Sequence, residues 1–220
     1  MKILQKICFV LLLTTFSSVY GGSCFVEPYN VDDCRVKAEQ GDTNSQMVLG
    51  WLYEKGNGVI QDNKEAIKWY RLAAKQGNVI AQFSLGEIYF YGKITLQDYQ
   101  ESFKWNKLAA EQGYTHSQKW LGYLYSMGQG VIQDYKAAAK WYRLSAEQGN
   151  AESQTYLGTM YWAGQGVIQD NVTAHMYFNI AASSGLENAI KGRYLVEEQM
   201  TRSQLEKAQD LAREWMRTHQ

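Results

Sequence analysis

Apolar and polar residues alternate over residues 43–55 with the period of an amphipathic helix. Leu49, Leu52 and Tyr53 are spaced by three and four positions, which places them on one helical face. The run Gly56-Asn57-Gly58 follows, and glycine tolerates the left-handed conformation found after many helices. The pattern predicts a helix over about residues 43–55 that ends in a tight turn.

A second helix is predicted after that turn. Asp62 can accept hydrogen bonds from the first backbone amides of this helix, and Glu65, three residues later, would complete a capping box. The helix is expected to run to about Gln76 and to end at Gly77. Its apolar residues are Ala66, Trp69, Tyr70, Leu72 and Ala73.

The two-helix unit recurs at a spacing of 36 residues. A Leu-Gly pair, a tyrosine three residues after that glycine, a capping aspartate and an aromatic residue all keep this step. They are Leu49-Gly50, Leu85-Gly86, Leu121-Gly122 and Leu157-Gly158; Tyr53, Tyr89, Tyr125 and Tyr161; Asp62, Asp98, Asp134 and Asp170; Trp69, Trp105, Trp141 and Tyr177. A fixed period in this range predicts a solenoid.

Two consequences for packing follow from the repeat. The recurring aromatic residues, Trp141 among them, are expected to form the core. A glycine inside a helix, such as Gly50, costs ~1 kcal/mol relative to alanine. Its recurrence therefore predicts that two helices approach each other closely at this position.

The ends of the chain differ from the repeated units. Residues 31–40 align with the back half of a second helix, so the stack is expected to start with a half repeat. Thr201 and Gln204 predict a capping box before a last amphipathic helix, which would cover the core of the final repeat. The expected divisions are a signal peptide at 1–22, an N-terminal segment and half repeat at 23–40, repeats at 41–76, 77–112, 113–148 and 149–185, and a C-terminal cap at 186–220.

Residues 1–22 have the layout of a secretory signal peptide. Lys2 and Lys6 precede the apolar run 7–13, and small residues lead up to Gly22. A membrane span needs ~20 apolar residues, so this run is short for one, and a retained membrane anchor is the alternative. We expect cleavage near Gly22 and a periplasmic or secreted mature chain with no transmembrane span.

Three cysteines occur in the chain, and Cys8 would leave with the signal peptide. Cys24 and Cys34 then remain in an oxidising compartment, which predicts a disulfide between them. The alternative is lipidation of Cys24, although the residues before it lack the leucine usual in a lipidation signal.

Charge and motifs point away from several functions. Lys plus Arg and Asp plus Glu both number 22, which disfavours a broad nucleic-acid-binding surface. His116, His175 and His219 are scattered, and no Cys/His spacing suits zinc. The sequence contains no Gly-x-Ser-x-Gly and no Ser-x-x-Lys. We expect no catalytic residue, no metal and no cofactor, and interpret His175 as a packed or exposed helical residue.

The repeated pattern Leu-Gly-x-x-Tyr-x-x-Gly-x-Gly-Val-x-x-Asp, followed by Trp-Tyr, Ala-Ala and Gly, resembles the Sel1-like repeat, a relative of the tetratricopeptide repeat. The resemblance covers about residues 31–200. The second unit departs from it, because 94–96 reads Ile-Thr-Leu and Asn106 replaces a tyrosine, so its turn is expected to differ. The resemblance implies an all-α, α/α superhelical solenoid that holds partner proteins together, often in the bacterial envelope or outside the cell.

Three positions of each first helix, on the side opposite the constant residues, differ between units. On a helical wheel, positions 47, 51 and 54 lie opposite the constant residues. The residues at these and the equivalent positions are Met47, Trp51 and Glu54; Phe83, Glu87 and Phe90; Lys119, Tyr123 and Ser126; Thr155, Thr159 and Trp162. In related solenoids the first helix lines the concave groove, so these residues are the candidate partner-binding strip. The alternative is that they pack against a neighbouring first helix.

These observations predict a non-enzymatic interaction or scaffold module that binds a protein, a peptide or a cell-wall glycan on the concave face. Two other functions stay open. One is a cell-envelope enzyme of the β-lactam or peptidoglycan hydrolase type, and the other is a secreted host-interaction factor.

Overall fold

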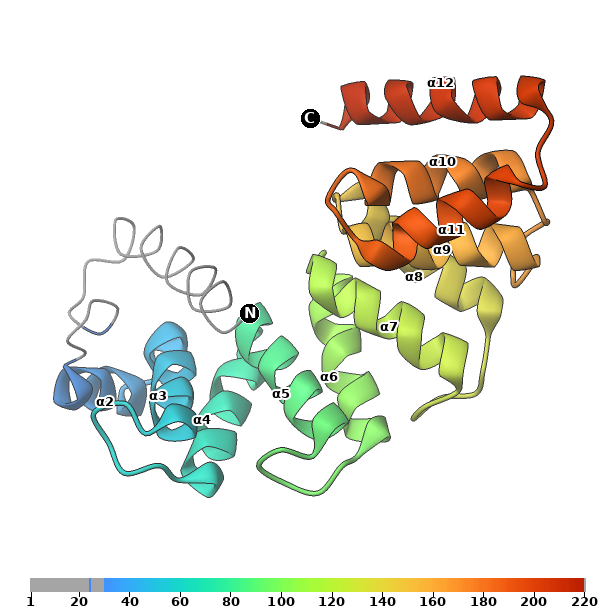
Figure 1. Ribbon diagram of the computed structural model, residues 1–220. Coiled ribbons are helices and arrows are strands. Elements are labelled where there is room, and N and C mark those ends of the chain that lie inside the picture. The colour runs from blue at the N-terminus through green and yellow to red at the C-terminus, as the bar shows by residue number, and fades with distance from the viewer. Residues whose placement is uncertain (1–23, 25–29, 220) are drawn as a thin grey trace. The chain divides into compact units, whose positions relative to one another are not determined.

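The computed structural model describes residue 24 and residues 30–219. The predicted signal peptide and the segment around Pro28 lie outside the described residues. The described part is helical and contains no strand. It forms two compact units, the first ending at Leu96 and the second beginning at Gln97 (Figure 1). No helix in these described ranges is both long and apolar enough to cross a membrane.

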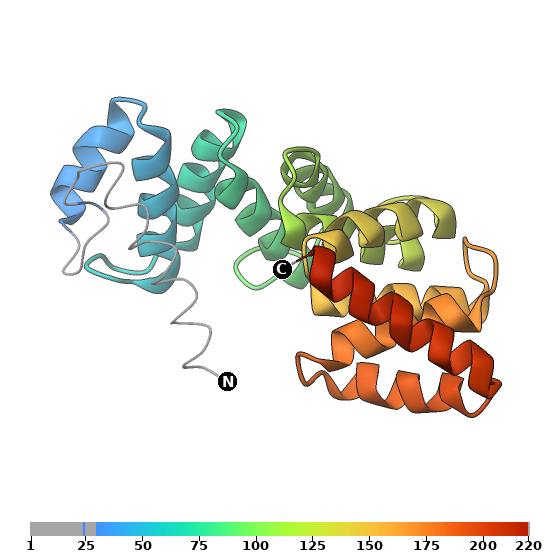
Figure 2. The same cartoon turned by 90° about the horizontal axis from the view of Figure 1, so that it is seen from above.

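Each unit is built from consecutive antiparallel helices joined by short connections (Figures 1 and 2). The first unit holds α2 (Val31–Glu39), α3 (Thr43–Lys55), α4 (Asn63–Lys75) and α5 (Val79–Tyr91). The second holds α6 (Tyr99–Glu111), α7 (Thr115–Met127), α8 (Tyr135–Glu147), α9 (Ala151–Ala163), α10 (Asn171–Ala182), α11 (Glu187–Glu197) and α12 (Arg202–Thr218).

The helix boundaries follow the capping residues in the sequence. The predicted helix over 43–55 is confirmed as α3, and Gly56 ends it in the left-handed conformation with φ 70°. The carboxylate of Asp62 accepts from the backbone amides of Lys64 and Glu65 and starts α4. The N-terminal half repeat is confirmed as α2, which packs against α3.

Of the two expected capping boxes, the one at Thr201 forms and the one at Asp62 does not. Thr201 and Gln204 exchange the two hydrogen bonds of a full box at the start of α12. Asp62 caps α4, but the carboxylate of Glu65 accepts from Lys68 Nζ, 3.0 Å away. Glu101 likewise accepts from Lys104 instead of the Asp98 amide. A lysine one turn along the helix offers these glutamates a charge-assisted bond, which competes with the backbone amide.

In the first, third and fourth repeats, the glycine in the middle of the first helix lies against an aromatic ring of the second helix. A Cβ atom added at Gly122 would come within 2.5 Å of the Tyr142 ring, and one at Gly158 within 2.9 Å of the Phe178 ring. Gly50 is equally close to a tyrosine ring. The expected close approach of the two helices is therefore confirmed, and the glycine is required because any side chain would occupy the space of the ring.

Buried glutamines connect successive repeats. Gln46 Nε2 donates to the carbonyl oxygen of Ala38, 3.0 Å away, and so joins α3 to the helix before it. The same bond recurs at the fourth position of every first helix. The other pairs are Gln82 with Ala74, Gln118 with Ala110, and Gln154 with Ala146. An unpaired buried amide would cost ~1–3 kcal/mol, so this pairing fixes how each helix pair sits on the preceding helix.

A second connection between repeats pairs arginine with tyrosine. Arg143 Nη2 donates to the Tyr161 hydroxyl at 2.9 Å, and Arg35 donates to Tyr53 at 3.1 Å. Arg71 and Tyr89 make the same pair. The helix of the second repeat has Lys107 at this position, and its Nζ lies 3.9 Å from Glu111 instead. Three of the four repeating tyrosines, Tyr53, Tyr89 and Tyr161, are thus bonded to the preceding helix.

The turn of the second repeat differs from the others, as its sequence predicts. Gly58, Gly130 and Gly166 have φ values of 73°, 71° and 70°. Ile94 occupies the equivalent position, and no non-glycine residue in the described ranges has a positive φ. A Cβ at Gly130 would lie 2.1 Å from the Tyr99 carbonyl oxygen, so this glycine lets the turn lie against the preceding second helix.

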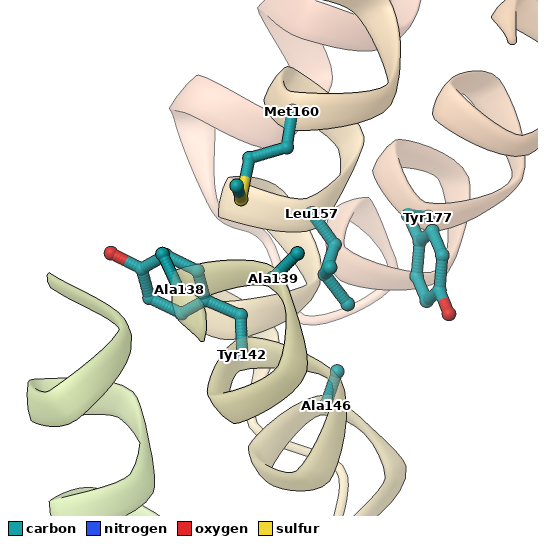
Figure 3. Close-up of a cluster of buried hydrophobic side chains, with 7 residues drawn as sticks. All are labelled: Ala138, Ala139, Tyr142, Ala146, Leu157, Met160 and Tyr177. Atoms are coloured by element: carbon teal, nitrogen blue, oxygen red, sulfur yellow. The ribbon is translucent and has the colours of Figure 1, made fainter. Parts of the chain in front are cut away.

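Half of the eight repeating aromatic residues are buried, namely Trp69, Tyr89, Trp105 and Tyr177, and the other four are half-buried, namely Tyr53, Tyr125, Trp141 and Tyr161. Trp69 and Trp105 are in the core, as expected. The expectation for Trp141 is wrong, because this side chain is only half-buried while its neighbour Tyr142 is 1% exposed. Figure 3 shows the cluster around Tyr142, where α8, α9 and α10 contribute small and large apolar side chains. Tyr142 takes the central place because its ring fills the space left by Gly122.

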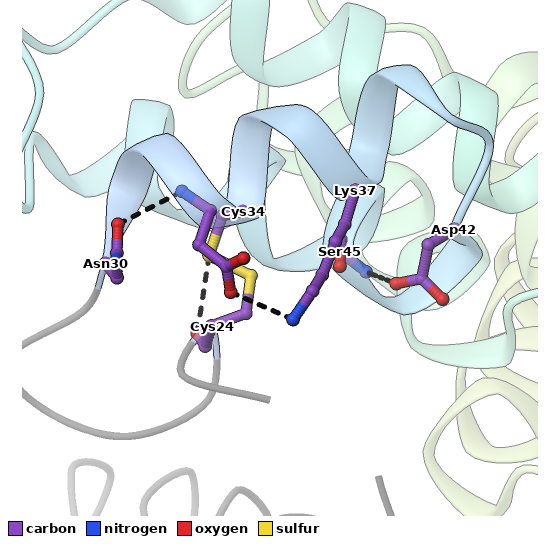
Figure 4. Close-up of a disulfide and its surroundings, with 7 residues drawn as sticks. Cys24, Asn30, Cys34, Lys37, Asp42 and Ser45 are labelled. Carbon is purple, nitrogen blue, oxygen red and sulfur yellow. Dashed lines mark hydrogen bonds and ion pairs between the residues drawn. A yellow bond between two sulfur atoms is a disulfide. The ribbon is translucent and has the colours of Figure 1, made fainter. Parts of the chain in front are cut away.

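The predicted disulfide between Cys24 and Cys34 is present (Figure 4). Both cysteines are fully buried, and Cys34 lies in the first turns of α2. Asn30 caps that helix by accepting from the Asp33 amide at 3.0 Å. The bridge therefore ties residue 24 to the helix that starts the stack.

Gly122→Ala should destabilise the protein. Alanine favours a helix by ~1 kcal/mol over glycine, but overpacking costs ~1–3 kcal/mol. The Tyr142 ring is enclosed and cannot move away, so we expect a net loss of up to ~2 kcal/mol in the free energy of unfolding, measured by urea denaturation. In a Tyr142→Ala background the same substitution should become stabilising. A stabilising effect in both backgrounds would contradict the close-approach argument.

The mature chain should contain no free thiol. Titration of the denatured, unreduced protein should detect neither Cys24 nor Cys34, and reduction should then reveal two thiols. Opening a loop of this size should lower stability by ~2–3 kcal/mol, with α2 the first helix to lose protection from hydrogen exchange. A diacylglycerol mass on Cys24 would instead support lipidation.

Candidate functional site

The candidate strip consists of the fifth, ninth and twelfth residues of α3, α5, α7 and α9. The structure places eleven of its twelve residues outside the buried core. Met47 is the exception, at 8% exposed, so it belongs to the core and does not contribute an open contact surface. Thr159 is fully on the surface, and the remaining members are half-buried. The helical-wheel argument therefore identifies a surface strip, with the first position of α3 covered.

In the first unit, the strip residue Glu54 serves internal packing. Its Oε2 accepts a hydrogen bond from the Tyr70 hydroxyl at 2.9 Å. Tyr70 is 2% exposed, and burial raises its pKa well above the usual value, with the Glu54 carboxylate adding to the effect. The buried hydroxyl stays protonated and needs an acceptor, which Glu54 supplies from the edge of the strip.

In the fourth repeat as well, the residue at the twelfth position of the first helix suits the buried aromatic residue of the second helix. There the buried aromatic is Phe178, which has no hydroxyl, and the strip residue is the apolar Trp162. Trp162 packs on the cluster of Ala174, Phe178 and Val196, and its indole Nε1 lies 3.4 Å from Gln199 Oε1. Part of the variation at this position thus follows from internal packing.

Polar strip residues in the second unit bond within or between first helices. Lys119 on α7 forms an ion pair with Glu152 on α9, which links neighbouring repeats. Ser126 Oγ donates to the Tyr123 carbonyl at 2.8 Å, and Thr155 Oγ1 donates to the Ala151 carbonyl at 2.9 Å. The ion pair between Lys119 and Glu152 supports the alternative interpretation, that part of the strip packs between neighbouring first helices.

Aromatic residues beside the strip extend it in the second unit. Trp120 and Tyr123 make an edge-to-face contact with centroids 5.7 Å apart. Tyr156 stacks on Tyr142 at 4.8 Å and remains 40% exposed. Sequence reasoning missed Trp120 and Tyr156, which occupy the sixth helical position. The signal was available, since this position reads Val48, Ser84, Trp120 and Tyr156 and varies as much as the strip.

The family match rests on the same four helix pairs. The Sel1 repeat family matches residues 43–78, 79–114, 115–150 and 151–186, more than half of the chain. The chain belongs to the Sel1 repeat family. Sel1 repeat proteins are protein-interaction scaffolds, and the fold is the all-α solenoid that the sequence predicts.

Two solved Sel1-type structures are similar to this chain. One is c5321, a protective antigen present in uropathogenic Escherichia coli strains that displays an SLR fold, with 34% identity over 86% of this chain and a TM-score of 0.77. The other is a Sel1 repeat protein from Oxalobacter formigenes, with 37% identity over 68% of this chain and a TM-score of 0.65. The chain spans 41% and 62% of the lengths of those two structures. No curated protein matches the chain.

Each Sel1 repeat also exposes one aliphatic side chain at its inter-helix loop, a feature the sequence analysis did not identify. The four are Ile60, Leu96, Ile132 and Ile168, and all are almost fully exposed. The loop that presents Ile132 is held firmly, since Gln133 Nε2 donates to the Ser126 carbonyl at 2.7 Å and the Asp134 amide donates to the Tyr125 carbonyl at 3.0 Å. Each of these tips is a second candidate point of contact for a partner.

The Sel1 repeats show little that resembles an enzyme site. Within the described ranges, no group of three or more His, Cys, Asp or Glu side chains is placed to hold a metal ion. A shallow polar depression lies at the start of α4, lined by residues 61–64. Its Asp62 already caps the helix through its carboxylate. His175 is buried in α10, which agrees with its interpretation as a packed residue.

Glu54→Ala should lower the stability of the first unit. The buried Tyr70 hydroxyl would lose its acceptor, at a cost of ~1–2 kcal/mol in the free energy of unfolding. Glu152→Ala is the matched control, because its ion pair with Lys119 is exposed and should contribute at most ~0.5 kcal/mol. Chemical denaturation of both variants measures the difference. Equal effects would mean that Glu54 is a surface residue without a packing role.

Proposed function

We propose that this protein is a non-enzymatic scaffold that binds a protein or peptide along the strip of its first helices, the side that the family resemblance places on the concave face. The observation that carries the proposal is the aromatic surface of α7 and α9. Trp120 and Tyr123 contact each other on α7, Tyr156 is exposed on α9, and none of the three is fully buried. Aromatic side chains at a surface commonly provide most of the affinity of a protein interface.

The strip has properties that the core does not require. The constant core residues, such as Leu121 and Leu157, are fully buried and identical in every repeat. The strip changes chemistry from repeat to repeat, and Lys119 and Glu152 place charges beside the aromatic residues. A surface of this kind fits a partner with apolar anchors flanked by charges, where the charges set orientation.

An exported location is part of the proposal. The disulfide between Cys24 and Cys34 is typical of an oxidising compartment, such as the periplasm or the extracellular space. The signal-peptide pattern in residues 1–22 supports the same location. Under this proposal the partner is another exported protein or a protein domain exposed at the cell surface.

Site-specific photocrosslinking tests where the partner binds. A photoreactive amino acid is placed at Tyr123 on the strip, at Ile132 on a loop tip, or at Lys140 on the exposed side of α8. Irradiation of intact producing cells and mass spectrometry then identify the crosslinked protein. The proposal expects one dominant partner at position 123 and none at 140. A dominant crosslink at 132 without one at 123 would move the binding surface to the loops.

Tyr123→Ala should weaken binding of that partner without unfolding the protein. Loss of an aromatic anchor commonly costs ~2 kcal/mol or more, about a 30-fold increase in Kd. Tyr194→Ala is the matched control, because Tyr194 is an exposed tyrosine of the same unit that lies off the strip, on α11. Titration calorimetry gives the Kd and thermal melting gives the stability. A variant that melts earlier but binds unchanged per folded molecule would mean that the strip serves packing only.

A further inference from the structure

His175 is a buried titratable residue at a position where the other repeats are apolar. It is the fifth residue of α10, and the equivalent residues are Ile67, Phe103 and Ala139. The imidazole is 1% exposed. Neither Nδ1 nor Nε2 has a hydrogen-bond partner among the described residues. A polar ring therefore occupies an apolar position and loses its hydration without gaining bonds.

The imidazole lies where the C-terminal helices dock on the last repeat. The helix α10 packs against α9, α11 and α12. Gly192 of α11 approaches the ring of Phe178 so closely that an added Cβ would lie 2.5 Å from it. Arg193 Nη1 donates to Asn179 Oδ1 at 3.1 Å, and Glu197 Oε2 lies 3.9 Å from His175 Nε2. His175 therefore lies at the contact between α10 and α11, and it is the only histidine in the helices α9 to α12.

The charged groups that act on the imidazole come from α11. Burial lowers the pKa of His175, the Glu197 carboxylate raises it to a smaller extent, and Arg193 lowers it further. No other residue of α10 is ionisable except Tyr177. The one charged residue of α9 is Glu152, in its first turn. The helix α12 packs against α10, and its buried residues are Ala208 and Ala212.

We infer that His175 is an acid-sensitive latch, and that its protonation loosens the docking of α11 and α12 on the last repeat. The neutral ring fits its apolar surroundings, whereas the charged ring requires water or a carboxylate that the docked arrangement holds 3.9 Å away. Loosening would uncover Phe178 at the end of the stack and Val196 on the face of α11 that covers it. Terminal caps of repeat proteins serve to cover such a surface.

The direction of the pH effect follows from the lowered pKa. A histidine whose pKa is lower in the folded than in the unfolded state contributes its full share of stability above the unfolded value of 6.5, and loses it as the pH falls towards the folded value. The latch is therefore closed at neutral pH and weakens below about pH 6.5. Each unit by which the pKa is lowered corresponds to a tenfold change in the docking equilibrium.

Hydrogen exchange at pH 7.5 and pH 5.5, corrected for the intrinsic dependence of exchange on pH, tests the latch. In the unaltered protein, protection of α11 and α12 should fall relative to α8 by up to about tenfold, because pH 5.5 lies one unit below the unfolded value of 6.5. His175→Phe, the residue found in the second repeat, should abolish this fall, and the control His219→Gln should keep it. An equal fall in His175→Phe, or no fall in the unaltered protein, would overturn the inference.

Glu197→Gln provides a test that does not alter the buried ring. Removing the carboxylate that raises the pKa of His175 should shift the loosening to lower pH. An NMR titration of the His175 ring in the unaltered protein measures the pKa itself and does not depend on whether His175→Phe folds. Titration at or above the ordinary value of 6.5 would contradict the latch.

Discussion

The close contact between a glycine of the first helix and an aromatic ring of the second is the constraint on which three of the four repeats depend. Gly122 lies so close to the Tyr142 ring that the two helices can meet only because the glycine has no side chain. The helix therefore gives up ~1 kcal/mol of intrinsic propensity, and the buried ring contributes more than this through apolar burial. The other contacts of the repeat, including the core leucines, are arranged around this approach.

Polar bonds then determine how one repeat follows another. The buried amide of Gln118 reaches the Ala110 carbonyl of the preceding helix, and Arg143 reaches Tyr161 of the following one. These bonds involve groups that would be costly to leave unpaired, so they select one arrangement of neighbouring helices where apolar packing alone would accept several. Within each unit, the surface of the first helices is presented in a fixed geometry as a result, which is what a binding surface requires.

The same demands explain why the strip is only partly available for a partner. The second helix carries Tyr70 in the first repeat and Phe178 in the fourth. Glu54 therefore accepts a hydrogen bond from the Tyr70 hydroxyl, whereas Trp162 covers the apolar ring of Phe178. Tyr123 and Tyr156 also pack against the core around Tyr142, but part of each ring stays at the surface, and these two residues carry the functional proposal. His175 is the reverse case, a polar residue at an apolar position, which is why it is the place to seek pH-dependent behaviour.

The sequence by itself determined the helices, their order and their boundaries. Gly56 and Asp62 act on their nearest neighbours in the chain, so their effect could be predicted without knowledge of the fold. The period of 36 residues determined the repeat for a similar reason, because identical units must pack identically. Only the tertiary structure decided which aromatic residue fills the core, since Trp141 and Tyr142 are adjacent and differ in which one faces Gly122. It also decided that Met47 is covered and that Glu65 bonds to Lys68, because these outcomes depend on side chains that compete for the same space or the same hydrogen bond.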